Sequence, residues 1–186
     1  MTKKMITLAA LMLLALGLQA QSLNGNWSMA QDWMTKLNKE MDDSSAKIDQ
    51  FGMSFTDKEA KVVMMMSMES DGMKMKIGVG VPGTYKRNGN NVKCNFDAKK
   101  VEINILDLQS NDEEVKGMLA NPTTRESLLK LINSMMEEEL KKDGNDLLEL
   151  ADPFKEFNIK SLTSSKLEIG VEDENDSIPF DRVKEL

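Results

Sequence analysis

The sequence predicts a mainly β protein: an antiparallel up-and-down β-barrel with an N-terminal helix and a helical insertion at about 112–151. Three observations predict it. Apolar and polar residues alternate along most of the chain, tight-turn dipeptides separate the alternating stretches, and helical spacing occurs only near the N-terminus and in the insertion. The count is eight or nine strands, and about eight strands close into a barrel that leaves few unpaired edges.

The first twenty residues have the pattern of a cleavable secretory signal. Lys3 and Lys4 precede an apolar run from Ile6 to Leu18, and Ala20 supplies a small residue at the exit. We therefore expect residues 1–20 to be removed, and residues 21–186 to form one exported domain, periplasmic or extracellular, without membrane insertion. The formal net charge of −7 offers no basic surface for nucleic acid.

The chain after the signal begins with a helix and a strand. Trp33, Met34 and Leu37 recur at helical intervals, which predicts a short amphipathic helix over about 29–43. The alternation that follows predicts a strand near 48–56.

Residues 62–81 form a predicted β-hairpin, and the sequence alone predicts which of its residues pair. Asp71-Gly72 readily supplies the two positive φ angles of a two-residue turn, so it fixes which residues face each other. The apolar pairs are Met68 with Met75, Met66 with Ile77, Met64 with Val79, and Val62 with Val81. The opposite side carries Glu69 facing Lys74. Such one-sided ribbons are typical of an antiparallel sheet that curls over an interior.

Two further turns predict two further hairpins on the same inward side. Asn88-Gly89 is the second two-residue turn, and Ala98-Lys99 is the third. The expected pairs are Tyr85 with Val92, Gly83 with Cys94, Phe96 with Val101, Cys94 with Ile103, and Val92 with Ile105.

The period becomes helical between about 112 and 151. Leu128, Leu131 and Met135 belong to one apolar stripe of a long helix, and a second short helical piece covers residues 147–150 before Pro153. Strand spacing then returns around Phe157–Ile159, Leu167–Val171 and Ile178–Arg182.

Three short motifs resemble those of the lipocalin-like (calycin-type) barrels. They are Gly25-Asn26-Trp27, Gly83-Thr84-Tyr85 and Phe180-Asp181-Arg182. The resemblance implies that Trp27 closes one end of the barrel and that Arg182 lies across its indole in a cation–π contact. The helix after Trp27, the insertion and the absence of Thr-Asp-Tyr make the chain more similar to secreted lipocalin-like domains of unknown function from Gram-negative bacteria. These imply a ligand-holding or protein-binding barrel, with no ligand named.

The composition argues against an enzyme. The chain has no histidine, which removes histidine-based dyads, histidine-bound zinc and the commonest general base at neutral pH. Cys94, the single cysteine, lies on an alternating strand, where a buried small hydrophobe is expected rather than a reactive thiol. We expect no catalytic residue and no cofactor.

The remaining hypotheses concern binding, and three stay open. The first is a small apolar ligand or a partner protein held in or on the barrel; the ligand-cavity candidates are Met64, Met66, Met68, Met75, Ile77, Tyr85, Phe96 and Ile103. The second is Cu(I) or Ag(I) handling, because thioethers are soft ligands; its candidates are Met64, Met66, Met68, Met73 and Met75. A role in the barrel wall or core outranks copper for these residues. The third is a filled barrel that acts as a structural or interaction protein and exposes the helical stripe.

Overall fold

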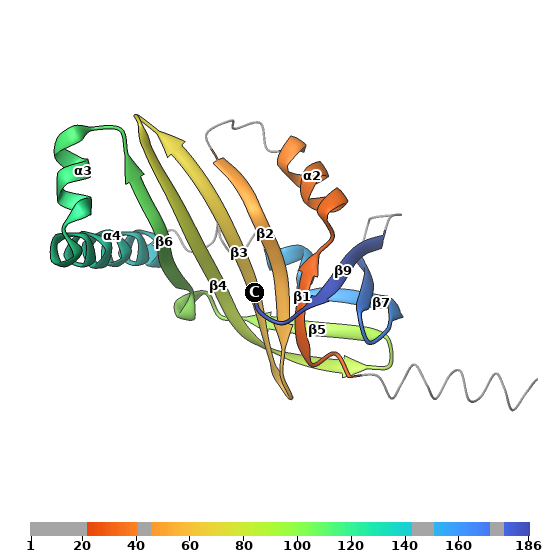
Figure 1. The fold of residues 1–186 in the computed structure, drawn as a ribbon. Helices are drawn as coiled ribbons and strands as arrows, with labels where there is room; N and C mark the ends of the chain where they lie inside the picture. Colours follow the sequence, from red (N-terminus) through yellow and green to blue (C-terminus); the bar gives the residue numbers. More distant parts are fainter. Residues whose placement is uncertain (1–21, 41–45, 143–150, 172–176) are drawn as a thin grey trace, which may run out of the picture.

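The fold is a closed antiparallel β-barrel with a ninth strand outside the ring (Figure 1). The structure, a computed structural model, describes residues 22–40, 46–142, 151–171 and 177–186. Within them the strands are β1 (Gly25–Met29), β2 (Ala46–Phe55), β3 (Glu59–Ser70), β4 (Met73–Asn88), β5 (Asn91–Phe96), β6 (Glu102–Ser110), β7 (Glu156–Leu162), β8 (Lys166–Val171) and β9 (Ser177–Val183). Eight of them, all but β6, pair in a ring that returns from β9 to β1. The predicted mainly β up-and-down barrel is confirmed.

The β3–β4 hairpin has the predicted register at every position. Asp71 and Gly72 take positive φ angles of 50° and 75°, as a two-residue turn of this type requires. All four predicted apolar pairs are present, and Lys74 Nζ lies 3.2 Å from Glu69 Oε2 on the opposite side. The turn therefore fixes the register of the longest ribbon in the barrel.

The predicted β4–β5 register is wrong by two residues. Tyr85 pairs with Cys94 rather than Val92, and Gly83 pairs with Phe96 rather than Cys94. Gly89 has a φ of 61° and is the first central residue of the turn, as in a type II′ hairpin, so the turn is Gly89-Asn90 rather than Asn88-Gly89. A slip of two residues keeps every side chain on its predicted face because the side-chain period of a strand is two.

The predicted β5–β6 hairpin does not form, so its expected pairs of Phe96 with Val101, Cys94 with Ile103 and Val92 with Ile105 are wrong. A 3-10 turn at Ala98–Lys100 replaces it, and the Asp97 side chain accepts a hydrogen bond of 3.1 Å from the Lys99 amide. β6 instead runs along β4, with Ile103 opposite Val79 and Ile105 opposite Ile77. The first half of β4 pairs with β6 and the second half with β5, which a chain of local hairpins could not indicate.

The helices lie within the predicted ranges. Helix α2 (Gln31–Glu40) follows strand β1, and the helical spacing of the sequence did not predict that strand. The insertion forms α3 (Glu113–Ala120) and α4 (Pro122–Lys142), and the expected helical piece at 147–150 lies outside the described residues. Asn121 separates the two helices, because its side chain accepts hydrogen bonds from the Thr123 and Thr124 amides at 3.0 and 3.1 Å. Among the described helices, none has the length and apolarity needed to cross a membrane.

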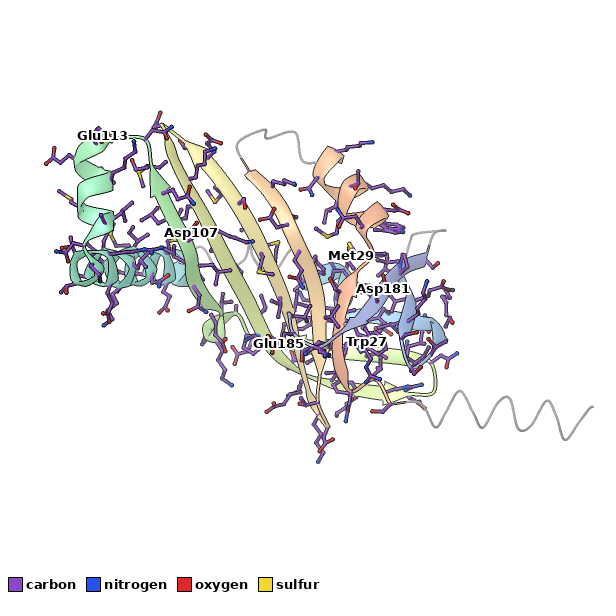
Figure 2. All side chains as sticks on the ribbon, viewed as in Figure 1. Trp27, Met29, Asp107, Glu113, Asp181 and Glu185 are labelled. Atoms are coloured by element: carbon purple, nitrogen blue, oxygen red, sulfur yellow. The ribbon has the colours of Figure 1, made fainter. Side chains whose placement is uncertain are left out.

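Helix α4 covers part of the outer edge of β6. The Ile105 amide donates to Asn133 Oδ1 at 3.0 Å, and Arg125 Nη2 lies 3.1 Å from Asp107 Oδ1. Asp107 is labelled on β6 in Figure 2. These contacts satisfy groups at a strand edge that would otherwise be open to another chain.

Aromatic side chains fill the interior of the ring. Phe55 packs edge-on against Phe157 with ring centroids 6.4 Å apart. Phe154, which comes from the 3-10 turn Asp152–Phe154 just before β7, packs between Phe51 at 5.0 Å and Phe180 at 6.3 Å. Side chains, including one brought in by a turn, thus occupy the part of the interior that the described residues surround.

Trp27 and Arg182 meet as the resemblance implies. They face each other on β1 and β9, with the guanidinium 5.1 Å from the centre of the indole ring. Trp27 is fully buried and its Nε1 donates to the Leu23 carbonyl at 2.7 Å, and Figure 2 labels it on β1. Arg182 also donates to the carbonyls of Asn24 and Ser164. Gly25 has a φ of 131°, which side chains rarely adopt, and a Cβ atom there would lie 2.7 Å from the guanidinium and displace it, so glycine suits this position beneath Arg182.

Replacing Arg182 with methionine is expected to lower the free energy of unfolding by about 1–3 kcal/mol. The change removes the cation–π contact and two hydrogen bonds but keeps an extended side chain. Urea denaturation measures the effect. Lys86→Met, which removes another exposed cation of the barrel, is the control, with an expected change within about 0.5 kcal/mol; equal effects of the two variants would contradict this role for Arg182.

Candidate functional site

The inner face of β2, β3, β4 and β6 forms a continuous apolar wall. Cross-strand pairing arranges it in rows: Phe51–Met64–Val79–Ile103, Ile48–Met66–Ile77–Ile105, and Ala46–Met68–Met75–Leu108. An extra residue in β2, between Ile48 and Gln50, and another in β6, opposite Lys76 and Ile77, keep the rows aligned. In Figure 1 the upper parts of these four strands run side by side and extend above the ring of the other strands.

The wall changes from buried to exposed toward the β3–β4 turn. Met64 is 3% exposed, Met66 and Met75 are half-buried, and Met68 is 37% exposed. Met73, beside the turn, is 39% exposed. The apolar wall is therefore buried for most of its length, and its methionines become partly open to solvent toward the turn.

Met66, Met68, Met73 and Met75 together form what we call the methionine face. All four lie on the inner side of the hairpin, two on β3 and two on β4. Yellow sulfur atoms are visible along this part of the two strands in Figure 2. Methionine is flexible and polarizable, so such a face can adapt to partners of different shape.

The predicted cavity candidates divide into three groups. Met66, Met68 and Met75 lie on the methionine face, whereas Met64, Ile77 and Ile103 lie on the same wall but inside the packed core. Tyr85 and Phe96 lie apart, near the β4–β5 hairpin. The structure thus brings six of the eight candidates together on one wall.

Tyr85 is half-buried beside the core. Its ring packs edge-on against Phe55 at 5.1 Å, and its hydroxyl donates to Asn24 Oδ1 at 3.4 Å. Burial raises the pKa of Tyr85, and the nearby Arg87 partly opposes that shift. These contacts give Tyr85 a packing role at the end of the ring that also holds Trp27.

One hollow, of about 410 Å³, has Met68 and Met75 among its lining residues. Another lies mainly among outward-facing polar side chains, and sequence reasoning did not identify it. This second hollow has a volume of about 550 Å³ and is lined by Ser54, Thr56, Glu59, Ala60, Lys61, Pro82, Gly83, Thr84, Asn95, Asp97, Lys100 and Glu102. It lies where β4 changes its partner from β6 to β5. Four of its charged side chains form two salt bridges: Lys61 with Glu102 at 2.6 Å, and Lys100 with Asp97 at 3.2 Å. Outward polar side chains carry no signal that distinguishes such a hollow from ordinary surface.

Of the five predicted metal-binding methionines, all but Met64 lie on the methionine face. Met64 is buried among core residues, so its thioether has a packing role. In the part of the chain that the structure describes, no three histidine, cysteine, aspartate or glutamate side chains are grouped to hold a metal ion. Among the described residues of the inner wall, the metal-ligand type that is concentrated is therefore thioether sulfur.

No family model matches the chain, and no curated protein is significantly similar to it.

Cys94 is a buried thiol, as its position on an alternating strand indicates. It lies in the core, where burial raises the pKa of the thiol to about 12. The thiol is therefore protonated at neutral pH and unsuited to nucleophilic attack or metal binding.

Alkylation of Cys94 by iodoacetamide at pH 8 is expected to be about a thousand times slower in the native protein than in urea, since thiolate is the reactive form. Because the folded pKa is raised, stability from this group is fully present below the unfolded pKa of about 9 and is lost as pH rises toward about 12. Cys94→Ala should lose less stability over that window. Equal alkylation rates in native and unfolded protein would contradict the burial.

Proposed function

We propose that the protein is a binding module, and that its ligand site is the methionine face at the open end of the apolar wall. One observation carries the proposal: the cross-strand row of Met68 and Met75 continues the core pattern but is partly open to water. Exposed apolar side chains that adjoin a core in an ordered row mark a binding surface more often than scattered ones do.

The chemistry of this face favours a small apolar ligand. Met68 and Met75 face each other, and Ala46, which is partly exposed, continues their row on β2, so a ligand seated there would cover apolar atoms on three strands. The charged pair Glu69–Lys74 lies on the opposite side of the ribbon. Methionine side chains, with three rotatable bonds, can fit an apolar ligand without a rigid pocket.

The proposal also covers the protein family, the cellular location and the functional class of the protein. We assign the protein to the lipocalin-like barrels on the basis of barrel topology and the Trp27–Arg182 contact, and to an exported location on the basis of residues 1–20. We also propose that it is not an enzyme and does not bind nucleic acid, given a chain without histidine and with a net charge of −7.

A second candidate is binding of a partner protein through α4. Leu131 and Met135, one helical turn apart, are 57% and 60% exposed, while Leu128 is half-buried. These two side chains belong to the apolar stripe that the sequence indicates, and they point away from the contacts of α4 with β6.

A neutral fluorescent probe, N-phenyl-1-naphthylamine, distinguishes the two surfaces. We expect the wild-type protein to enhance its fluorescence and Met68→Glu to weaken probe binding by about tenfold or more, because the new carboxylate would be desolvated by the ligand. Met135→Glu, an equally drastic change at an exposed methionine of α4, should leave binding within about twofold.

Two results would contradict the assignment of the ligand site. One is unchanged probe binding by Met68→Glu, and the other is loss of binding by Met135→Glu alone. The second result would favour the surface of α4. Circular dichroism and thermal unfolding of each variant establish that the barrel is retained.

A further inference from the structure

Methionine is over-represented among the exposed apolar side chains. Within the described residues, the exposed large hydrophobic residues are Met68, Met73, Leu106, Met118, Leu131 and Met135, so four of six are methionine. Met68 and Met73 belong to the methionine face, whereas Met118 and Met135 lie on α3 and α4. Packing explains a buried residue such as Met64, but it does not explain thioethers that remain open to water.

The methionine face consists of two Met-x-Met sequences on facing strands. β3 supplies Met66 and Met68, and β4 supplies Met73 and Met75. In each sequence the two thioethers share one side of the strand because side chains alternate. Two such sequences on adjacent strands of one hairpin bring four soft donors to one surface.

The register places these donors within reach of one another. Met68 is directly opposite Met75, and directly opposed residues have Cβ atoms about 4.5–5.5 Å apart. Met66 is the diagonal neighbour of Met75, and Met73 is the diagonal neighbour of Met68; diagonal neighbours are separated by about 7–8 Å. Thioether side chains are long and freely rotating, so the sulfur atoms of Met66, Met68 and Met75 can turn toward a common point.

We propose that the methionine face binds one soft monovalent cation, Cu(I) or Ag(I), through the thioether sulfurs of Met66, Met68 and Met75, with Met73 at the rim. This goes beyond the proposed function by assigning a second class of ligand, a soft cation, to the same face. Each sulfur donates a lone pair to the metal, and no proton or electron is transferred. Thioethers suit soft cations, and the net charge of −7 attracts cations to the protein.

The donor set predicts how binding depends on pH. Imidazole and thiolate ligands must lose a proton before they bind a metal, so their affinity rises with pH. Thioethers carry no such proton, the chain has no histidine, and burial keeps Cys94 protonated. The affinity for Cu(I) should therefore be constant between about pH 5.5 and 7.5.

The test is anaerobic titration of the full protein with Cu(I) against the chromophoric chelator bicinchoninate, repeated with Ag(I) in air. We expect one tightly held equivalent in the wild-type protein and a loss of affinity of about tenfold or more in Met66→Leu/Met68→Leu. Met118→Leu/Met135→Leu is the matched control, because it removes two exposed thioethers elsewhere and should bind as the wild type does.

The metal titration and the probe assay separate this inference from the proposed function, because the probe assay compares the wild type with Met68→Glu. Met66→Leu/Met68→Leu removes sulfur but keeps apolar side chains of similar volume, so this variant should still fold, which circular dichroism checks. Three results would overturn the metal site: no Cu(I) or Ag(I) bound by the wild type, equal affinity in the Met66→Leu/Met68→Leu variant, or an affinity that rises steeply with pH. None of these results affects the probe-binding test.

Discussion

The register of the β3–β4 hairpin is the constraint on which the rest of the structure depends. Asp71 and Gly72 take the positive φ angles of a two-residue turn, and from that turn twelve cross-strand pairs follow without a bulge. A shift of one residue would move Val62, Met64 and Ile77 out of the core and bring the Glu69–Lys74 pair inside. Burial of the apolar side and solvation of the charged side therefore favour the same register as the turn itself.

Because β4 is long, the β3–β4 hairpin contributes both to the closed ring and to the apolar wall. β4 pairs with β3 from Met73 to Thr84, and on its other edge it pairs with β6 first and β5 later. Near β5 the inner face closes over aromatic side chains, whereas near β6 it extends beyond the ring and ends in half-exposed methionines. Both the apolar ligand and the soft cation that we propose use this unclosed end. At the other, packed end Arg182 covers Trp27.

Local chemistry made the fold class and the β3–β4 register predictable from sequence, and the Trp27–Arg182 contact was implied by the resemblance. The β4–β5 turn was misplaced because Asn88-Gly89 and Gly89-Asn90 both provide acceptable hairpin turns, and only the structure selects the second. The pairing of β6 with β4 is a long-range choice with no local signal, and the Asp97-capped turn redirects the chain toward it. Alternation also predicts which residues share a face but not how far the core extends, so it could not distinguish buried Met64 from exposed Met68.

Cross-strand nuclear Overhauser effects test the wall most directly, because β6 has two possible neighbours. The account predicts contacts between the backbone protons of Met66 and Ile77 and between those of Ile77 and Ile105, which join β3, β4 and β6 in one row. Contacts of Ile105 with Val92, or a Met66 that faces away from Ile77, would contradict it.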